Sequence, residues 1–121
     1  MDPRVEQVAR TLARTLRAAG PVSAFLQAEA TLRQDAHALG LIRELQHRQQ
    51  ALAQKQQDGG DMTQAEIDEL RRLQEQVRHD ASISRYVRAQ AALQEILARV
   101  VQEISALLGV DLASLAGVGG C

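Results

Sequence analysis

The chain has 121 residues, of which 45% are hydrophobic and only 2% are aromatic, and its formal net charge is −1 at pH 7. A core without aromatic side chains must come from Leu, Ile, Val and Ala, and a chain this small gains core by packing several helices or by pairing. The near-zero charge gives no reason to expect direct binding to nucleic acid.

The first predicted helix begins at Asp2-Pro3, because Asp is a good N-cap and Pro suits the first helical position. Gly20-Pro21 ends this helix and starts a second one, over about residues 22–33. The large apolar residues of the first helix share one face: Val5, Val8, Leu12 and Leu16.

A long antiparallel helical hairpin is predicted next. Its first helix covers residues 36–57 and has a Gln-rich second half, which we expect to project beyond the core or to lie against a partner. Residues 58–61, DGGD, form the turn. Thr63 and Glu66 have the spacing of a capping box at the start of the second helix. The short connection makes the two helices antiparallel neighbours.

The last predicted helix follows Asp80 and ends at Gly109. Its apolar residues step by four and three positions, with Gln90 as the one polar interruption, and Val101 widens the stripe. This spacing predicts a coiled-coil-like seam that serves the core, binds a partner or mediates self-association. The seam residues are Tyr86, Leu93, Leu97, Val100, Ile104 and Leu107.

These patterns predict an all-α helical bundle of about five helices that is oligomeric. Residues 1–108 are expected to form a single helical domain, and residues 109–121 a flexible Gly-rich tail. No run approaches the roughly 20 apolar residues that span a bilayer, so no membrane insertion is expected. With one cysteine in the chain, we expect a cytoplasmic protein.

No catalytic motif is recognisable, and the sequence therefore predicts a protein that is not an enzyme. The three histidines are not spaced as zinc ligands on one helix face, and no serine stands in a G-x-S-x-G motif. We expect the charged residues of the fourth helix to be solvated and to form i, i+4 pairs, such as Asp68 with Arg72.

Cys121 ends the chain after a run of glycines. Three interpretations of it stay open: an incidental thiol, a disulfide between two chains, or a ligand of a metal or iron–sulfur cluster. One thiolate cannot hold a cluster, because such sites take four ligands. The other ligands would have to come from other subunits.

The hairpin and the last helix resemble the YlbF/YmcA family of small bacterial helical proteins over roughly residues 5–108. That family shows a K-Q-x-x-G-x-x-[LM]-T-x-x-E-[IL]-x-x-L pattern, followed by an I-x-x-Y-x-x-A-x-x-x-L stretch. The second stretch is matched here by Ile83, Tyr86, Ala89 and Leu93. The matching hairpin residues are mainly capping and core residues: Lys55, Gln56, Gly59, Met62, Thr63, Glu66, Ile67 and Leu70.

The resemblance implies a non-enzymatic regulatory adaptor that binds protein partners through helical surfaces. The partners it implies are a related family member, a YaaT-like protein and the endoribonuclease RNase Y. Such a complex modulates RNase Y-dependent mRNA processing and thereby competence, sporulation or biofilm development. The alternative is a structural or chaperone-like helical oligomer with no link to RNA processing.

The resemblance also bears on the cofactor. Complexes of this family are associated with iron–sulfur clusters, and some members end in cysteine-rich tails. The ending GVGGC looks like a reduced version of such a tail, with one cysteine instead of several. The resemblance therefore implies Cys121 as a ligand of a cluster shared within a complex.

Overall fold

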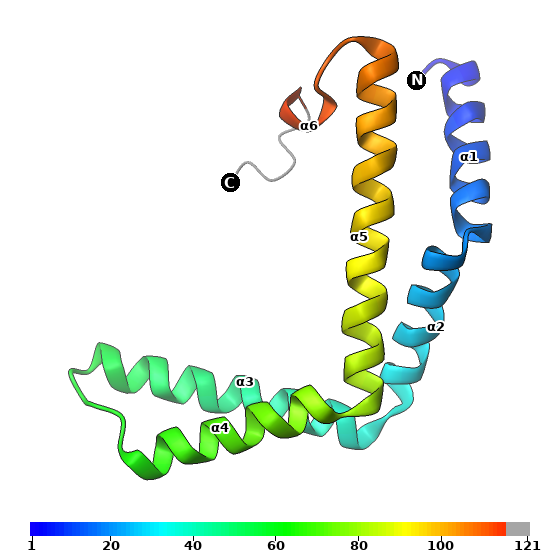
Figure 1. Cartoon of the computed structure of the whole chain (residues 1–121). Coiled ribbons are helices and arrows are strands. Elements are labelled where there is room, and N and C mark those ends of the chain that lie inside the picture. The colour runs from blue at the N-terminus through cyan, green and yellow to red at the C-terminus, as the bar shows by residue number, and fades with distance from the viewer. Residues whose placement is uncertain (116–121) are drawn as a thin grey trace. The chain divides into compact units, whose positions relative to one another are not determined.

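Figure 1 shows the computed structural model of the chain, which describes residues 1–115. Those residues form six helices and no strand, which confirms the predicted all-α fold. The sixth helix is one turn long and lies within residues 109–121. The helices are α1 (Pro3–Ala18), α2 (Gly20–Gln34), α3 (Ala36–Gln57), α4 (Gln64–His79), α5 (Ala81–Leu108) and α6 (Leu112–Leu115).

The helix boundaries follow their capping residues closely. Asp2 accepts a hydrogen bond from the backbone N–H of Arg4 at 2.8 Å and so caps α1. Helix α2 begins at Gly20, two residues before its predicted start. Pro21 fits the first turn because the missing N–H is not needed there.

By its internal contacts the chain divides into two compact units. The hairpin unit is residues 26–87, and the open unit is residues 1–25 together with the chain from residue 88 onward. Helices α2 and α5 each run through both units. The single domain over residues 1–108 and the tail over residues 109–121 stay predictions.

The hairpin unit contains all seven buried hydrophobic side chains among residues 1–115. Helices α3 and α4 lie antiparallel and in contact, which confirms the predicted hairpin. Five of the buried side chains form one cluster that joins four helices. Its members are Leu32 from α2, Ala38 and Leu41 from α3, Leu73 from α4 and Ile83 from α5.

Asp35 ties the start of α3 to the start of α5. Its Oδ1 accepts from the backbone N–H of Ala38 at 3.0 Å, and its Oδ2 accepts from the hydroxyl of Ser82 at 2.6 Å. These two donors, the Ser82 hydroxyl first, lower the pKa of the Asp35 carboxyl. One carboxylate thus caps a helix and fixes the point where two helices begin side by side.

The open unit contains α1, residues 88–108 of α5 and α6, and none of its described residues is buried. It holds ten of the twelve large hydrophobic side chains that are exposed among residues 1–115. Every residue of α1 from Pro3 to Thr15 is exposed. The apolar faces of α1 and of the second half of α5 are therefore open to solvent in one chain.

Substitution by alanine should have opposite effects on stability at Gly59 and at Gly40. Gly59 has φ +82°, a conformation that costs an L-residue about 1–2 kcal/mol, so Gly59→Ala should destabilise the hairpin by about that amount. Gly40 lies inside α3, and beyond the adjacent backbone of its own helix nothing lies within 4 Å of the position of a new Cβ, so Gly40→Ala should stabilise by about 0.5–1 kcal/mol. Urea unfolding measures both; equal effects of the two substitutions would contradict the turn geometry.

Candidate protein-binding face

The motif residues of the hairpin build the chain reversal between α3 and α4. Gly59 adopts the left-handed conformation, and its backbone N–H donates to the carbonyl of Gln56 at 3.1 Å. The N–H of Gly60 donates to the carbonyl of Lys55 at 2.9 Å. This pair of bonds is the Schellman arrangement, which satisfies the last carbonyls of α3.

The start of α4 is fixed by the capping box that the sequence predicts. The hydroxyl of Thr63 accepts from the N–H of Glu66, and a Glu66 carboxylate oxygen accepts from the N–H of Thr63, both at 3.1 Å. The ammonium of Lys55 donates to the same carboxylate at 2.5 Å and so joins the end of α3 to the start of α4. Met62, Ile67 and Leu70 are half-buried beside this junction. The contacts of these motif residues are those of a structural element.

The contacts of Glu66 lead us to expect that the stability of the hairpin decreases in acid. Hydrogen bonds from Lys55 and then from Thr63 lower the pKa of the Glu66 carboxyl from 4.5 to about 2. A carboxyl with a lowered pKa stabilises the fold above its ordinary value, and this contribution is lost as the pH falls from about 4.5 toward 2. The thermal midpoint of Glu66→Gln should therefore lie below that of wild type at pH 7 and approach it near pH 2. The matched control Glu103→Gln removes an exposed carboxylate for which no ion pair is seen within residues 1–115, and a similar pH profile for both variants would contradict the role of Glu66.

The predicted seam is covered to very different degrees along α5. Tyr86 packs against the core cluster of the hairpin unit. In the open unit Leu93, Val100 and Ile104 are half-buried. Leu97 is 42% exposed and Leu107 is 85% exposed, although both follow the same spacing.

The charged side chains in the second half of α5 lie on one narrow side of the helix, and the rest of its circumference is uncharged. Between residues 88 and 108 there are four charged side chains, and at ~100° per residue they fall within an arc of about 80° of the helix circumference. They are Arg88, Glu95, Arg99 and Glu103. We call the remaining, uncharged side of residues 88–108 the α5 face. This side is mainly apolar but also carries Gln90, Gln94 and Gln102, and a broad apolar side of this kind is typical of a helix that packs against neighbours in a bundle.

Helix α6 makes the α5 face concave near the end of the helix. Gly109, with φ +75°, stops α5, and the N–H of Val110 donates to the carbonyl of Ser105 at 3.2 Å. The hydroxyl of Ser105 then accepts from the N–H of Leu112 at 3.1 Å, so the chain folds back along α5.

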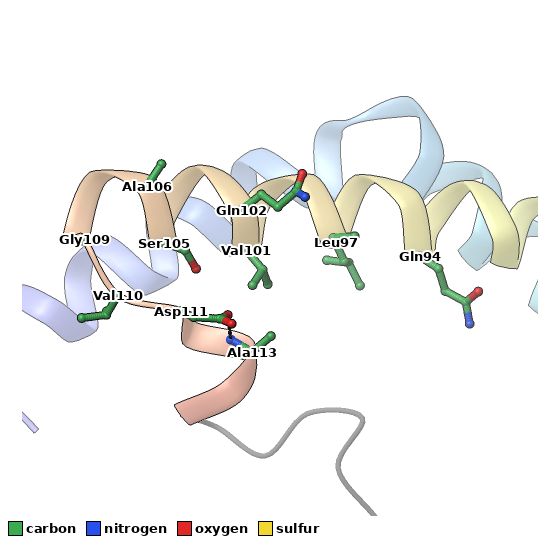
Figure 2. Close-up of a pocket in the computed structure, with 11 residues that line it drawn as sticks. Gln94, Leu97, Val101, Gln102, Ser105, Ala106, Gly109, Val110, Asp111 and Ala113 are labelled. Carbon is green, nitrogen blue, oxygen red and sulfur yellow. Dashed lines mark hydrogen bonds between the residues drawn. The ribbon is translucent and has the colours of Figure 1, made fainter.

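The result is a groove of about 800 Å³ between α5 and the turn that carries α6. Figure 2 shows Leu97, Val101 and Ser105 pointing from α5 toward the side on which α6 lies. Polar groups at its edge already have partners: Asp111 accepts from the N–H groups of Ala113 and Ser114. The groove is therefore an apolar surface with a polar rim, which suits the apolar side of another helix.

The sequence missed this groove because the spacing of apolar residues does not show which of them other helices cover. The pattern of α1 predicts one apolar face but does not show that Val5, Val8 and Leu12 remain exposed. The confinement of charge to one narrow side of α5 was the available signal for a helix that needs several neighbours.

One predicted ion pair is wrong. Arg72 pairs with Glu69, at 2.5 Å between Nη2 and Oε1, and not with Asp68, and Glu69 also lies 3.5 Å from Arg48 of α3. Asp68 accepts instead from the side-chain amide of Gln64 at 2.9 Å. Both arrangements keep the outer side of α4 polar and solvated.

Two further features concern metals and membranes. No group of three or more His, Cys, Asp or Glu residues within residues 1–115 is placed to hold a metal ion. Cys121, the predicted shared ligand, lies outside the described residues. Within residues 1–115, none of the helices combines the length and the hydropathy of a membrane-spanning segment.

The fold and the α5 face define an all-helical protein with an open apolar helical surface. Residues 5–108 match the profile of a family described as "Control of competence regulator ComK, YlbF/YmcA". The chain belongs to this family, which confirms the resemblance of its hairpin and last helix. No curated protein and no solved structure matches the chain.

Proposed function

We propose that this protein is a non-enzymatic regulatory adaptor of the cytoplasm. Its family is described by control of the competence regulator ComK, which supports a regulatory role. Within that role, it joins a complex with a related family member, a YaaT-like protein and RNase Y. The complex modulates RNase Y-dependent mRNA processing and thereby competence, sporulation or biofilm development.

The observation that carries this proposal is the open α5 face. The hairpin unit buries its own core, whereas the open unit has no buried side chain among its described residues. Leu97 and Val101 face an apolar groove, and contiguous exposed apolar surface of this kind marks sites of protein interaction. A protein that works by presenting this face needs no catalytic residue.

Affinity capture from the native host tests the proposal. The bait is the full chain, compared with Leu97→Asp combined with Val101→Asp, which places two charges on the α5 face. Wild type should bring down the YaaT-like protein and RNase Y, and the double variant should lose both, because a buried unpaired charge is costly. Mass spectrometry of the bound proteins gives the readout.

Arg99→Asp is the matched control for this capture. It changes the net charge by −2, as the double variant does, but on the charged side of α5. It should retain the partners. Capture of unrelated clients without RNase Y supports the alternative, a structural or chaperone-like helical oligomer.

Cys121 belongs to the proposal as a ligand of an iron–sulfur cluster shared within the complex. The chain contains one cysteine, so it fits a cluster only as one contributor among several chains. Anaerobic capture of wild type should give an absorption band in the visible region, and Cys121→Ser should reduce it while the same proteins are retained. A wild-type complex without this absorption band would contradict the cluster and would show that Cys121 is an incidental thiol.

A further inference from the structure

We infer that the polar side of α1 is a second docking site, which binds an acidic helix of a partner protein through three arginines. We call Arg10, Arg14 and Arg17 the arginine row. The inference rests on the proposed function, because an adaptor joins partners through separate surfaces. It adds to the apolar α5 face a surface that recognises charge.

The arginine row lies on one side of an exposed helix. At ~100° per residue its members fall within an arc of about 60° of α1, and this arc is opposite the apolar residues Val8 and Leu12. All three arginines are exposed. At ~1.5 Å per residue the row extends over about 10 Å of the helix axis. A partner that covers the apolar side of α1 therefore leaves the row accessible.

The charge of the row is not balanced by its own helix. Glu6 is the only acidic residue in α1, and it pairs with Arg10 at 2.7 Å between Oε1 and Nη2. Arg14 and Arg17 form no ion pair within residues 1–115, and no acidic residue stands three or four positions from either. With four arginines and one glutamate, α1 has a net charge of +3, and the rest of the chain has −4. An acidic partner would relieve the repulsion between these neighbouring like charges.

The other helices of the hairpin unit treat their arginines differently. Four arginines of α2, α3 and α4 each pair with a glutamate three or four positions earlier: Arg33 with Glu29, Arg48 with Glu44, Arg72 with Glu69 and Arg78 with Glu75. The remaining two, Arg43 and Arg71, have no arginine three or four positions away. A row of adjacent arginines is thus specific to α1 among these four helices.

The chemistry of the row favours carboxylates on a helix over RNA or lipid. Guanidinium groups bind carboxylates through paired N–H donors, and a partner helix with acidic residues spaced by four and three positions repeats the spacing of the row. Single-stranded RNA is held largely by stacking on aromatic side chains, and α1 contains none. A helix on a lipid surface buries its apolar side, which in α1 would turn the row away from the headgroups.

Binding of two synthetic peptides to the purified full chain tests the inference. Both peptides are alanine-based helices of the same composition. In one, three glutamates are spaced by four and three positions on one side, and in the other the same glutamates are distributed around the helix. Fluorescence anisotropy at low salt should show that wild type binds the first peptide about fivefold more tightly, and added salt should reduce this preference.

Arg14→Gln combined with Arg17→Gln should weaken binding of the first peptide about tenfold and abolish the preference between the peptides. Circular dichroism should stay that of wild type, because Arg and Gln are both good helix formers. The matched control is Arg43→Gln combined with Arg71→Gln, which removes the same charge from two exposed arginines of the hairpin unit. It should retain the preference and bind the first peptide within about twofold of wild type.

Three results would overturn the inference. They are equal binding of the two peptides by wild type, an equal loss of binding in both double variants, and tighter binding of oligouridine or of phosphatidylglycerol vesicles than of the first peptide. If wild type still captures the YaaT-like protein and RNase Y in any of these cases, the adaptor function stands without the row. A preference for the first peptide in a chain that captures no partner instead contradicts the adaptor function.

Discussion

Replacing Leu73 by alanine should destabilise the protein by about 2–5 kcal/mol, the cost of a Leu→Ala change in a packed core. Leu73 is 1% exposed and is the largest fully buried side chain among the described residues. It lies on α4 and packs in the cluster with residues of α2, α3 and α5, so the cavity would open where four helices meet. Since the free energy of unfolding of a small domain is only about 5–15 kcal/mol, this substitution would remove a large part of the stability of the protein.

Chemical denaturation followed by circular dichroism measures the effect of Leu73→Ala. Leu26→Ala is the matched control, because Leu26 is 40% exposed and leaves a smaller cavity. It should cost well under half as much as Leu73→Ala. Equal losses for the two variants would show that the buried cluster does not hold the hairpin unit together.

Ala38→Leu should destabilise by about 1–3 kcal/mol or more, because a larger side chain overpacks a filled core. Ala38 is 0% exposed, and its N–H is held by Asp35 at the point where α3 begins. The backbone there is fixed further by the bond between Asp35 and Ser82, so it cannot shift easily to make room. We expect a lower thermal midpoint together with a weaker Asp35–Ser82 contact.

Ala51→Leu is the matched control for Ala38→Leu, because it adds the same atoms at an exposed position of the same helix. It should be close to neutral, since Ala and Leu are both good helix formers. A thermal midpoint of Ala38→Leu equal to that of wild type would contradict the tight packing at the start of α3.

The local chemistry of the chain predicts most of the fold. Asp2, Asp35, Thr63 and Asp80 each cap a helix, and the bounds of α3 follow from the sequence alone. These signals act within one turn of the helix, so no tertiary contact is needed to recognise them.

The α5 face could be predicted only in part. Leu93 and Leu97 belong to one apolar stripe, yet Leu93 is half-buried and Leu97 is open to the groove. Periodicity places apolar residues on a side of the helix, but their burial depends on where the other helices pack. The reversal of the chain after Gly109 also depends on the hydrogen bond between the hydroxyl of Ser105 and the N–H of Leu112. No short sequence motif predicts this bond.

Hydrogen–deuterium exchange of the full chain tests most directly the claim that the hairpin unit is complete and that another chain completes the open unit. In wild type, the amides of α1 and of residues 88–108 should be protected together with those around Leu41 and Leu73. In Leu97→Asp combined with Val101→Asp, exchange should accelerate in α1 and residues 88–108 and stay unchanged around Leu41 and Leu73. Exchange that accelerates equally in both units, or in neither, would contradict the account.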